Sequence, residues 1–316
     1  MALAIVHGMI GILFILLVPM STQAQNLTVI LLGTGNPIPS LERFGPSTLV
    51  EAGAETLLFD CGRGVAQRLW QLQRPLRVTA VFLTHLHSDH IVGIPDLWLT
   101  GWLPAPSTEP FRLWGPTGTK EMMANLEKAY QADIRIRIED EKLPPQGVAV
   151  LAEDITEGVV YEKNGVKVTA FDVDHGLVKP ALGYRIDYGG RSVVISGDTR
   201  FSENLIRFAT GTDVVVHEVA AVKEELLSKS ERVRRVMGHH TTPEEAGTVF
   251  ARVKPKLAVY THIGLFTIDP ISAPTIEDLI ALTRKTYAGP LEVGEDLLTI
   301  KVGDTVEVQR FTPPAR

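Results

Sequence analysis

Cysteine is almost absent from this chain, and positive charge is not in excess. The single cysteine among 316 residues, Cys61, cannot form an internal disulfide and suits either redox compartment. A formal net charge of −6 gives no sign of the excess positive charge that a polyanion-binding protein usually carries. The loop Gly33-Thr34-Gly35 has no third glycine at the dinucleotide-binding spacing, so it indicates a tight loop. With 45% hydrophobic residues, the chain is an ordinary globular protein that can bury a sizeable core.

The N-terminal segment 1–24 is predicted to be a signal peptide. Residues 9–18 form an apolar core of signal-peptide length, and the small residues Thr22 and Ala24 predict cleavage after Ala24. Export to the periplasm or the medium follows, with residues 25–316 as the mature domain. Because no lysine or arginine precedes the apolar core, two alternatives stay open: an uncleaved membrane anchor, and a cytoplasmic protein translated from Met20.

One short segment combines three histidines with one aspartate: His85, His87, Asp89 and His90. It follows the apolar run 78–83, which predicts a buried strand that ends at this loop. Side chains that alternate along the loop can face two cations, with His85 and His87 toward one and Asp89 and His90 toward the other. Imidazole and carboxylate donors without a thiolate favour Zn²⁺ or a similar ion with open positions for water. The alternative is a polar turn, but three neighbouring imidazoles would repel one another when protonated.

The spacing His-x-His-x-Asp-His resembles that of the metallo-β-lactamase superfamily, in which further ligands follow later strands. The apolar runs 168–173, 192–197 and 257–261 predict strands, and they lead to a histidine, an aspartate and a histidine. Segments across nearly the whole mature chain resemble the ribonuclease Z and arylsulfatase-like branch: Leu32-Gly33-Thr34-Gly35, Leu58-Phe59-Asp60-Cys61-Gly62, Asp174-His175-Gly176, Gly183-Tyr184-Arg185, Ser196-Gly197-Asp198-Thr199-Arg200, Val216-His217-Glu218, His240-Thr241-Thr242 and Thr261-His262-Ile263. The resemblance implies an α/β fold, the four-layer αβ/βα metallo-β-lactamase sandwich.

The resemblance also implies a binuclear centre that holds two Zn²⁺, with Mn²⁺ or iron as alternatives. The implied ligands are His85, His87 and His175 for one ion and Asp89, His90 and His262 for the other, with Asp198 as the bridge. Asp60 would support the metal loop by orienting a ligand histidine, although a turn cap is the alternative for this residue. Two cations about 3.5–4 Å apart lower the pKa of a bridging water, and the hydroxide formed in this way can attack an ester.

Three side chains near the implied ligands are candidates for proton transfer or charge stabilisation. Asp89 could orient the attacking water or accept its proton while remaining a ligand. His240 matches a family histidine beyond the metals, which would stabilise the transition state or protonate the leaving oxygen, and we prefer it to His239. Glu218 would hold His240 in the required tautomer. For His217, a buried structural role and a site role both stay open.

The predicted substrate is a small anionic ester, either a phosphodiester or an aryl sulfate. Family members that process transfer RNA carry a long Gly/Pro-rich arm between the strands matching 183–186 and 192–195, where this chain has only a hairpin turn. Together with the acidic charge and the export segment, this predicts no nucleic-acid partner, and no stable membrane association once the signal is cleaved. Arg43 and Arg200 are candidates for binding an anionic oxygen, with plain surface charge as the alternative.

Other activities stay open beside the anionic ester. A lactone or β-lactam is the first alternative, because the same hydroxide can attack an acyl carbon. Processing of the 3′ end of transfer RNA, and zinc-dependent binding without turnover, are less favoured.

Some members of the branch are dimers, so a homodimer is also allowed.

Several elements outside the site are predicted from local patterns. Residues 65–73 have helical spacing, and a second helix is expected from about 117 to 130. Trp98 and Trp102 lie four residues apart on a short predicted helix and are expected in the core, with an aromatic substrate wall as the alternative. The Pro/Gly-containing stretch 143–147 is expected to join two similar halves, and the tail 291–316 to lie at a sheet edge.

Overall fold

The computed structural model describes residues 27–104 and 107–313, and two β-sheets dominate it. The strands of the first sheet are, in spatial order, β15 (Val306–Gln309), β14 (Leu298–Val302), β1 (Leu27–Gly33), β2 (Ser47–Ala52), β3 (Glu55–Phe59), β4 (Ala80–Phe82), β5 (Phe111–Gly115) and β6 (Val150–Asp154). The second sheet contains β13 (Leu291–Val293), β12 (Leu257–Leu265), β11 (Val214–Ala221), β10 (Arg191–Ile195), β9 (Leu182–Tyr188), β8 (Val166–Asp172) and β7 (Gly158–Lys163).

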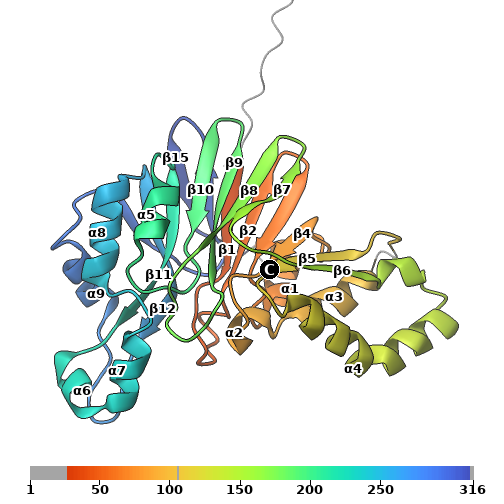
Figure 1. Cartoon of the computed structure of the whole chain (residues 1–316), viewed down its shortest axis with the longest axis horizontal. Coiled ribbons are helices and arrows are strands. Elements are labelled where there is room, and N and C mark those ends of the chain that lie inside the picture. Colours follow the sequence, from red (N-terminus) through yellow and green to blue (C-terminus); the bar gives the residue numbers. More distant parts are fainter. Residues whose placement is uncertain (1–26, 105–106, 314–316) are drawn as a thin grey trace, which may run out of the picture.

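Helices cover the outer face of each sheet (Figure 1). On the first sheet lie α1 (Val65–Gln71), α2 (Ser88–Ile91), α3 (Ile94–Trp102), α4 (Thr119–Glu139) and the 3₁₀ turn η1 (Pro145–Gly147). The second half of the chain supplies α5 (Glu203–Ala209), α6 (Glu224–Lys229), α7 (Glu231–Met237), α8 (Pro243–Val253) and α9 (Ile276–Thr283). The layers are therefore helix, sheet, sheet, helix, which confirms the predicted αβ/βα sandwich.

Strand β1 illustrates why the layers form. Leu27, Val29 and Leu31 pack into the core between the two sheets, whereas Ile30 and Leu32 pack beneath the helices of the first half. Because side chains alternate along a strand, a run that is apolar at every position is buried on both faces. A third cluster fills the space between the second sheet and α5, α8 and α9, and all three clusters consist mainly of aliphatic and aromatic residues.

The polar loops that follow the strands meet at one region because the central strands of both sheets run parallel. β3, β4 and β5 pair in parallel in the first sheet, and β10, β11 and β12 do so in the second. The carboxyl ends of parallel strands lie at the same edge of a sheet, where α/β proteins place their sites. The loops after β4, β8 and β10 and the end of β12 carry the predicted metal ligands.

The β9–β10 hairpin closes with a two-residue turn, as predicted. Tyr188 pairs with Arg191, and Gly189 and Gly190 both have positive φ, of 57° and 75°. Glycine adopts this backbone geometry without steric cost, so the two strands can reverse within two residues. The chain therefore has no long insertion between β9 and β10.

Some predicted boundaries were wrong. The joint between the halves lies between β6 and β7, not at 143–147, because β6 still pairs with β5 in the first sheet. Helix α4 continues to Glu139, nine residues beyond the predicted end.

Trp98 and Trp102 are core residues, as expected. Both are fully buried, and their indole N–H groups donate to the carbonyls of Val148 and Pro144.

The two ends of the chain differ in what the structure describes. The tail after residue 291 adds β13 to the second sheet and β14 and β15 to the edge of the first, as expected. The segment 1–24, predicted as a signal peptide, lies outside the described residues. Among residues 27–104 and 107–313, no helix is both long and apolar enough to cross a membrane.

Candidate metal centre

Asp60 holds the loop from Thr84 to His90 in place through hydrogen bonds to Thr84. The Thr84 backbone N–H donates to Asp60 Oδ1 at 2.8 Å, and the Thr84 hydroxyl donates to Oδ2 at 2.9 Å. Asp60 itself has a positive φ of 59°, which lets its side chain turn back under the neighbouring strand end. These contacts fix the backbone immediately before the first histidine of the loop.

One group of potential ligands consists of His85, His87, His175 and Asp198, whose donor atoms lie within 4.8 Å of one another. His175 Nε2 is 3.4 Å from His87 Nδ1. Asp198 Oδ2 is 3.8 Å from His175 Nε2 and 3.9 Å from His85 Nε2. His87 is exposed while the other three are buried, so the group opens to the surface on the His87 side.

A second group consists of Asp89, His90 and His262, and it adjoins the first through Asp198. Asp89 Oδ2 lies 3.2 Å from His262 Nε2 and 3.5 Å from His90 Nε2. Asp198 Oδ2 lies 3.3 Å from His262 Nε2 and 3.5 Å from His90 Nε2. One carboxylate oxygen thus approaches imidazoles of both groups, which is the position predicted for a bridging ligand.

The donor atoms have the spacing and the unmet bonding capacity of a metal site. Ligand atoms about 2.0–2.1 Å from a tetrahedral ion are about 3.3 Å apart, close to the separations in both groups. Of the six buried side-chain atoms without a hydrogen-bond partner among the described residues, three belong to the candidate ligands: His85 Nε2, His90 Nε2 and Asp198 Oδ1. Since buried polar atoms are almost always paired, their shared direction fits a cation. The residues present therefore can hold metal ions.

The charge states of His85 and Asp198 agree with this arrangement. Burial holds the pKa of His85 well below its ordinary value, and the neighbouring histidines add to this effect, so the ring is neutral and its nitrogen can bind a cation. Burial opposes ionisation of Asp198, but His262, His90 and His85 outweigh it and hold the pKa of this carboxyl well below its usual range. A neutral imidazole beside an ionised carboxylate is the donor set that Zn²⁺ and similar ions accept.

The ligand histidines are oriented by contacts on their far side. His90 Nδ1 lies 2.8 Å from Asp60 Oδ2, and His175 Nδ1 lies 2.8 Å from the backbone carbonyl of His239. Such outer contacts fix the tautomer, so that the other ring nitrogen faces the ion. The Asp60 contact is what the sequence predicted for this residue, whereas the carbonyl of His239 and the hydroxyl of Thr84 were not foreseen. A contact with a backbone carbonyl cannot be predicted from residue types, because every residue has a carbonyl.

His240 lies at the edge of the two groups and is tied to Glu218. The His240 Nδ1 atom is 3.2 Å from Glu218 Oε1, which also accepts the backbone N–H of Thr241 at 2.9 Å. Burial lowers the pKa of His240, but the Glu218 carboxylate outweighs it and raises the pKa to about 9. His240 also forms a third potential group with Asp198 and His262. Its ring therefore lies close to Asp198 and His262.

The neighbouring histidines differ from His240 in their surroundings. Burial, together with His240 and His175, lowers the pKa of His239 to about 4, and none of the described carboxylates hydrogen-bonds to its ring. His217 is buried, with its Nδ1 atom 2.6 Å from the carbonyl of Glu218 and its ring edge-on to Phe250. These contacts support the structural alternative for His217.

The helix after His240 begins as its sequence predicts. Thr242 accepts the backbone N–H of Glu245, the Glu245 carboxylate accepts the N–H of Thr242, and Pro243 is the first helical residue. This capping box satisfies free N–H groups at the start of α8 and fixes where the chain leaves the centre. His240 is therefore held by a rigid helix start on one side and by Glu218 on the other.

Neither arginine proposed from the sequence lies free at the metal groups. Arg200 is half exposed and forms an ion pair with Asp174 at 2.9 Å, which supports the surface-charge alternative. Arg43 donates to the Thr34 hydroxyl at 2.7 Å and to the Gly294 carbonyl at 2.6 Å. Burial lowers the pKa of Arg43, and its side chain lines a cavity together with Asn36 and Ile263, the residue after His262.

Comparison with known proteins agrees with the fold. The model of the β-lactamase superfamily domain matches residues 55–263. The ribonuclease Z of Mycolicibacterium gilvum is 36% identical over 283 residues, which cover 87% of this chain and 96% of that protein. The ribonuclease Z of Mycobacterium avium is 36% identical over 284 residues, which cover 87% of this chain and 98% of that protein.

Solved structures share the fold at lower identity. The metallo-β-lactamase fold protein YhfI from Bacillus subtilis has a TM-score of 0.68 at 17% identity and covers 88% of this chain and all of its own. The short form of human tRNase Z has a TM-score of 0.63 at 24% identity and covers 86% of this chain and 98% of its own. The name ribonuclease Z refers to RNA, which counts against the expectation that nucleic acids are not partners.

The family match, and relatives that align over nearly their full length, support the same assignment. This chain belongs to the metallo-β-lactamase superfamily of metal-dependent hydrolases, in its ribonuclease Z-like branch.

Proposed function

We propose that this protein is a two-metal hydrolase that cleaves small phosphodiesters. The observation that carries the proposal is the position of Asp198, whose Oδ2 atom lies 3.3–3.9 Å from imidazole nitrogens of both ligand groups. We assign one ion, Zn²⁺, to His85, His87 and His175, and a second to Asp89, His90 and His262, with Asp198 shared. Two bound cations would lower the pKa of water at the centre and neutralise the anionic oxygens of the ester.

Residues of the chain would orient the attacking water and transfer a proton to the leaving oxygen. Asp89, held 3.2 Å from His262, is placed to orient the attacking water. His240, with its Nδ1 side facing Glu218, presents the other ring nitrogen toward the centre and can give a proton to the leaving oxygen. Glu218 keeps that proton available, because its carboxylate favours the protonated ring.

A phosphodiester is preferred over the other esters for two reasons. The relatives at 36% identity carry the name ribonuclease, an activity on phosphodiester bonds, whereas an aryl sulfate or a lactone has no such support. A small substrate is preferred because the β9–β10 hairpin ends in a two-residue turn, so the chain has no arm there to grip a large RNA. The aryl sulfate and the lactone or β-lactam remain the alternatives to test.

Processing of RNA is the second candidate function. The observation that favours it is the identity to proteins named ribonuclease Z, which extends over 96–98% of their length. Cleavage of a precursor transfer RNA by the purified protein, sensitive to salt, would show that a nucleic acid is the substrate. Salt sensitivity is the useful criterion, because contacts to phosphates weaken as the salt concentration rises.

A substrate panel separates these candidates. We expect the zinc-loaded protein from residue 25 to hydrolyse bis(4-nitrophenyl) phosphate faster than 4-nitrophenyl sulfate and faster than a lactone. Metal-free protein, prepared with a chelator and restored with Zn²⁺, is the control for dependence on the ions. A preference for the lactone, or no turnover of any ester by protein with two verified zinc ions, would contradict the proposal.

Asp60 offers a prediction about metal affinity without any assay of turnover. Replacing Asp60 by alanine removes the contact that orients His90, and we expect zinc to bind about 10–100-fold more weakly. Competition with a chromophoric chelator measures this change. The control is Asp96→Ala, an exposed acid on α3 that contacts Gln67 and Thr100. Equal zinc affinity in the two variants would mean that Asp60 is only a turn residue.

A further inference from the structure

We infer that a cavity beside the metal centre is the subsite for an apolar organic group of the ester, about the size of an aromatic ring. The cavity, which we call the α7–β12 pocket, has a volume of about 430 Å³ and is formed by the 35–43 loop, α7 and the segment 263–268. The inference rests on the proposed function. It specifies the substrate class further, as an ester that carries an apolar organic group. Pockets for small organic ligands usually have volumes of about 300–1,000 Å³.

The α7–β12 pocket adjoins the centre through the chain segments that form both. Ile263, in its wall, is next in sequence to His262, and its carbonyl accepts the Asn36 side-chain amide at 2.9 Å. On the opposite wall, the carbonyl of Val236 accepts the backbone N–H of His239 at 3.2 Å, one residue before His240. A group bound in the pocket would therefore lie against the same strand and helix end that hold the reacting groups.

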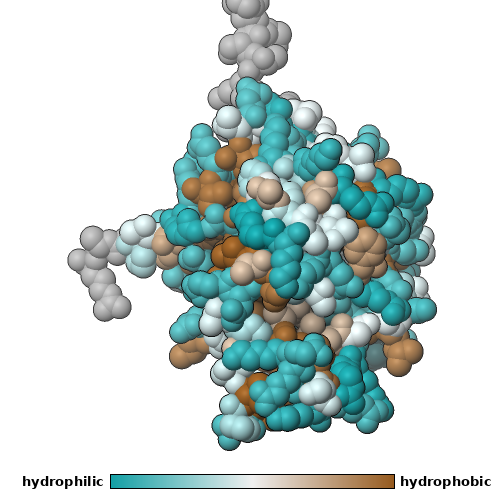
Figure 2. Space-filling model, turned by 90° about the vertical axis from the view of Figure 1, so that its left-hand side faces the viewer, coloured by the Kyte–Doolittle hydropathy of each residue, from teal (hydrophilic) through white to brown (hydrophobic). Residues whose placement is uncertain are grey.

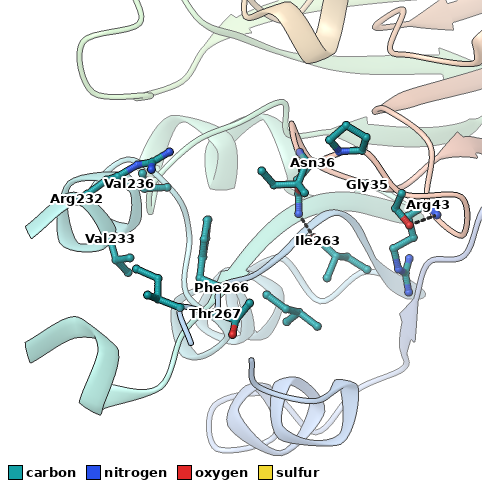
Figure 3. A pocket seen from close by; sticks show the side chains of 14 residues that line it. Gly35, Asn36, Arg43, Arg232, Val233, Val236, Ile263, Phe266 and Thr267 are labelled. Carbon is teal, nitrogen blue, oxygen red and sulfur yellow. Dashed lines mark hydrogen bonds between the residues drawn. The ribbon is translucent and has the colours of Figure 1, made fainter. Parts of the chain in front are cut away.

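The walls of the pocket are mainly apolar. Val233 and Val236 of α7 line one side, and Ile263 and Phe266 line another (Figure 3). The two cationic side chains, Arg232 and Arg43, lie at opposite ends. Apolar walls favour an organic group that gains by leaving water, and the Arg232 guanidinium at one end favours a ligand with net negative charge. An anionic ester with an aryl or branched alkyl substituent has both properties.

The rim of the pocket exposes apolar side chains that a ligand would cover. Ile38 is 71% exposed and Ile268 is 47% exposed, and both line the pocket. The surface over α6 to α9 is otherwise mostly hydrophilic, with hydrophobic residues in small separate groups (Figure 2). No described residue forms an ion pair or hydrogen bond with the Arg232 side chain, whereas Arg235 on the same helix pairs with Glu231. Surface that is apolar, hollowed and next to a reactive centre is typical of a binding site.

Phosphonates test the subsite directly, because each carries a single organic group. We expect titration calorimetry on the zinc-loaded protein to show that phenylphosphonate binds at least about 10-fold more tightly than methylphosphonate. Val236→Trp fills the pocket, and the double variant Ile38→Ser/Ile268→Ser makes its rim polar. Both should reduce this ratio to about 1 to 3-fold. Leu41→Ser is the matched control, because Leu41 is 91% exposed on the same loop as Ile38 but does not line the pocket.

The outcomes distinguish this inference from the proposed function. If Val236→Trp keeps the wild-type ratio, or if it weakens both phosphonates equally, the pocket is not the subsite, even where bis(4-nitrophenyl) phosphate is hydrolysed. If the protein turns over no phosphodiester but shows a phenyl preference that Val236→Trp removes and Leu41→Ser keeps, the subsite stands and the proposed reaction fails. A wild-type protein that binds both phosphonates with equal affinity also contradicts the inference.

Discussion

Replacing Asp198 by alanine is expected to lower kcat by at least about 10⁴-fold and to remove zinc from both positions. Its Oδ2 atom lies within 3.9 Å of His85, His90, His175 and His262, so this carboxylate approaches imidazoles of both ligand groups. Without it, the carboxylate between the two groups is lost, and Asp89 remains beside His90 and His262 only. Each ion would also lose one of its few protein ligands, which weakens binding at both positions.

The measurement is the zinc content after dialysis, together with kcat for bis(4-nitrophenyl) phosphate. The matched control is Asp172→Ala, an exposed carboxylate at the end of β8, three residues before His175 and outside both groups. We expect this control to keep two zinc ions and full activity. A protein with alanine at 198 that still holds two zinc ions would refute the shared position of this carboxylate. A protein that loses the ions but keeps turnover would refute the metal-dependent reaction.

The candidate ligands can be picked out from the sequence alone because they occupy short patterns. The loop with His85, His87, Asp89 and His90 is local, and its residue types already define the chemistry of the donors. The other three ligands follow apolar runs, and the parallel strand order then brings the strand ends together. Their meeting in space depends on the fold, which the resemblance supplied. The core positions of Trp98 and Trp102 followed from helical spacing in the same way.

What the sequence could not predict are contacts made by the backbone and by distant segments. The carbonyl of His239 that orients His175 is invisible in a residue pattern, because every residue has a carbonyl. The α7–β12 pocket combines the 35–43 loop with a helix and a strand end that follow about two hundred residues later, so no local window contains it. For Arg200, proximity in sequence to Asp198 left two alternatives open, and the ion pair with Asp174 at the surface supports the surface-charge alternative.

Replacing His240 by alanine is expected to lower kcat by about 10²–10⁴-fold while two zinc ions remain bound. The Nδ1 atom of the His240 ring lies 3.2 Å from Glu218 Oε1. The ring adjoins the centre but belongs to neither of the two ligand groups. A group that only gives a proton to the leaving oxygen matters most when that oxygen is a poor leaving group. The loss should therefore be larger for an alkyl phosphodiester than for a 4-nitrophenyl phosphodiester.

Comparison of two leaving groups separates proton transfer by His240 from a structural role. We expect Glu218→Gln to show the same dependence on the leaving group with a smaller loss, of about 10-fold, because the amide still contacts the ring but no longer favours its protonated form. His239→Ala keeps the backbone carbonyl that contacts His175 and is expected to lower kcat by less than about 10-fold for both substrates. Equal losses for the two leaving groups in His240→Ala would mean that this residue stabilises the site without transferring a proton. A greater loss in His239→Ala would reverse the assignment of the two neighbours.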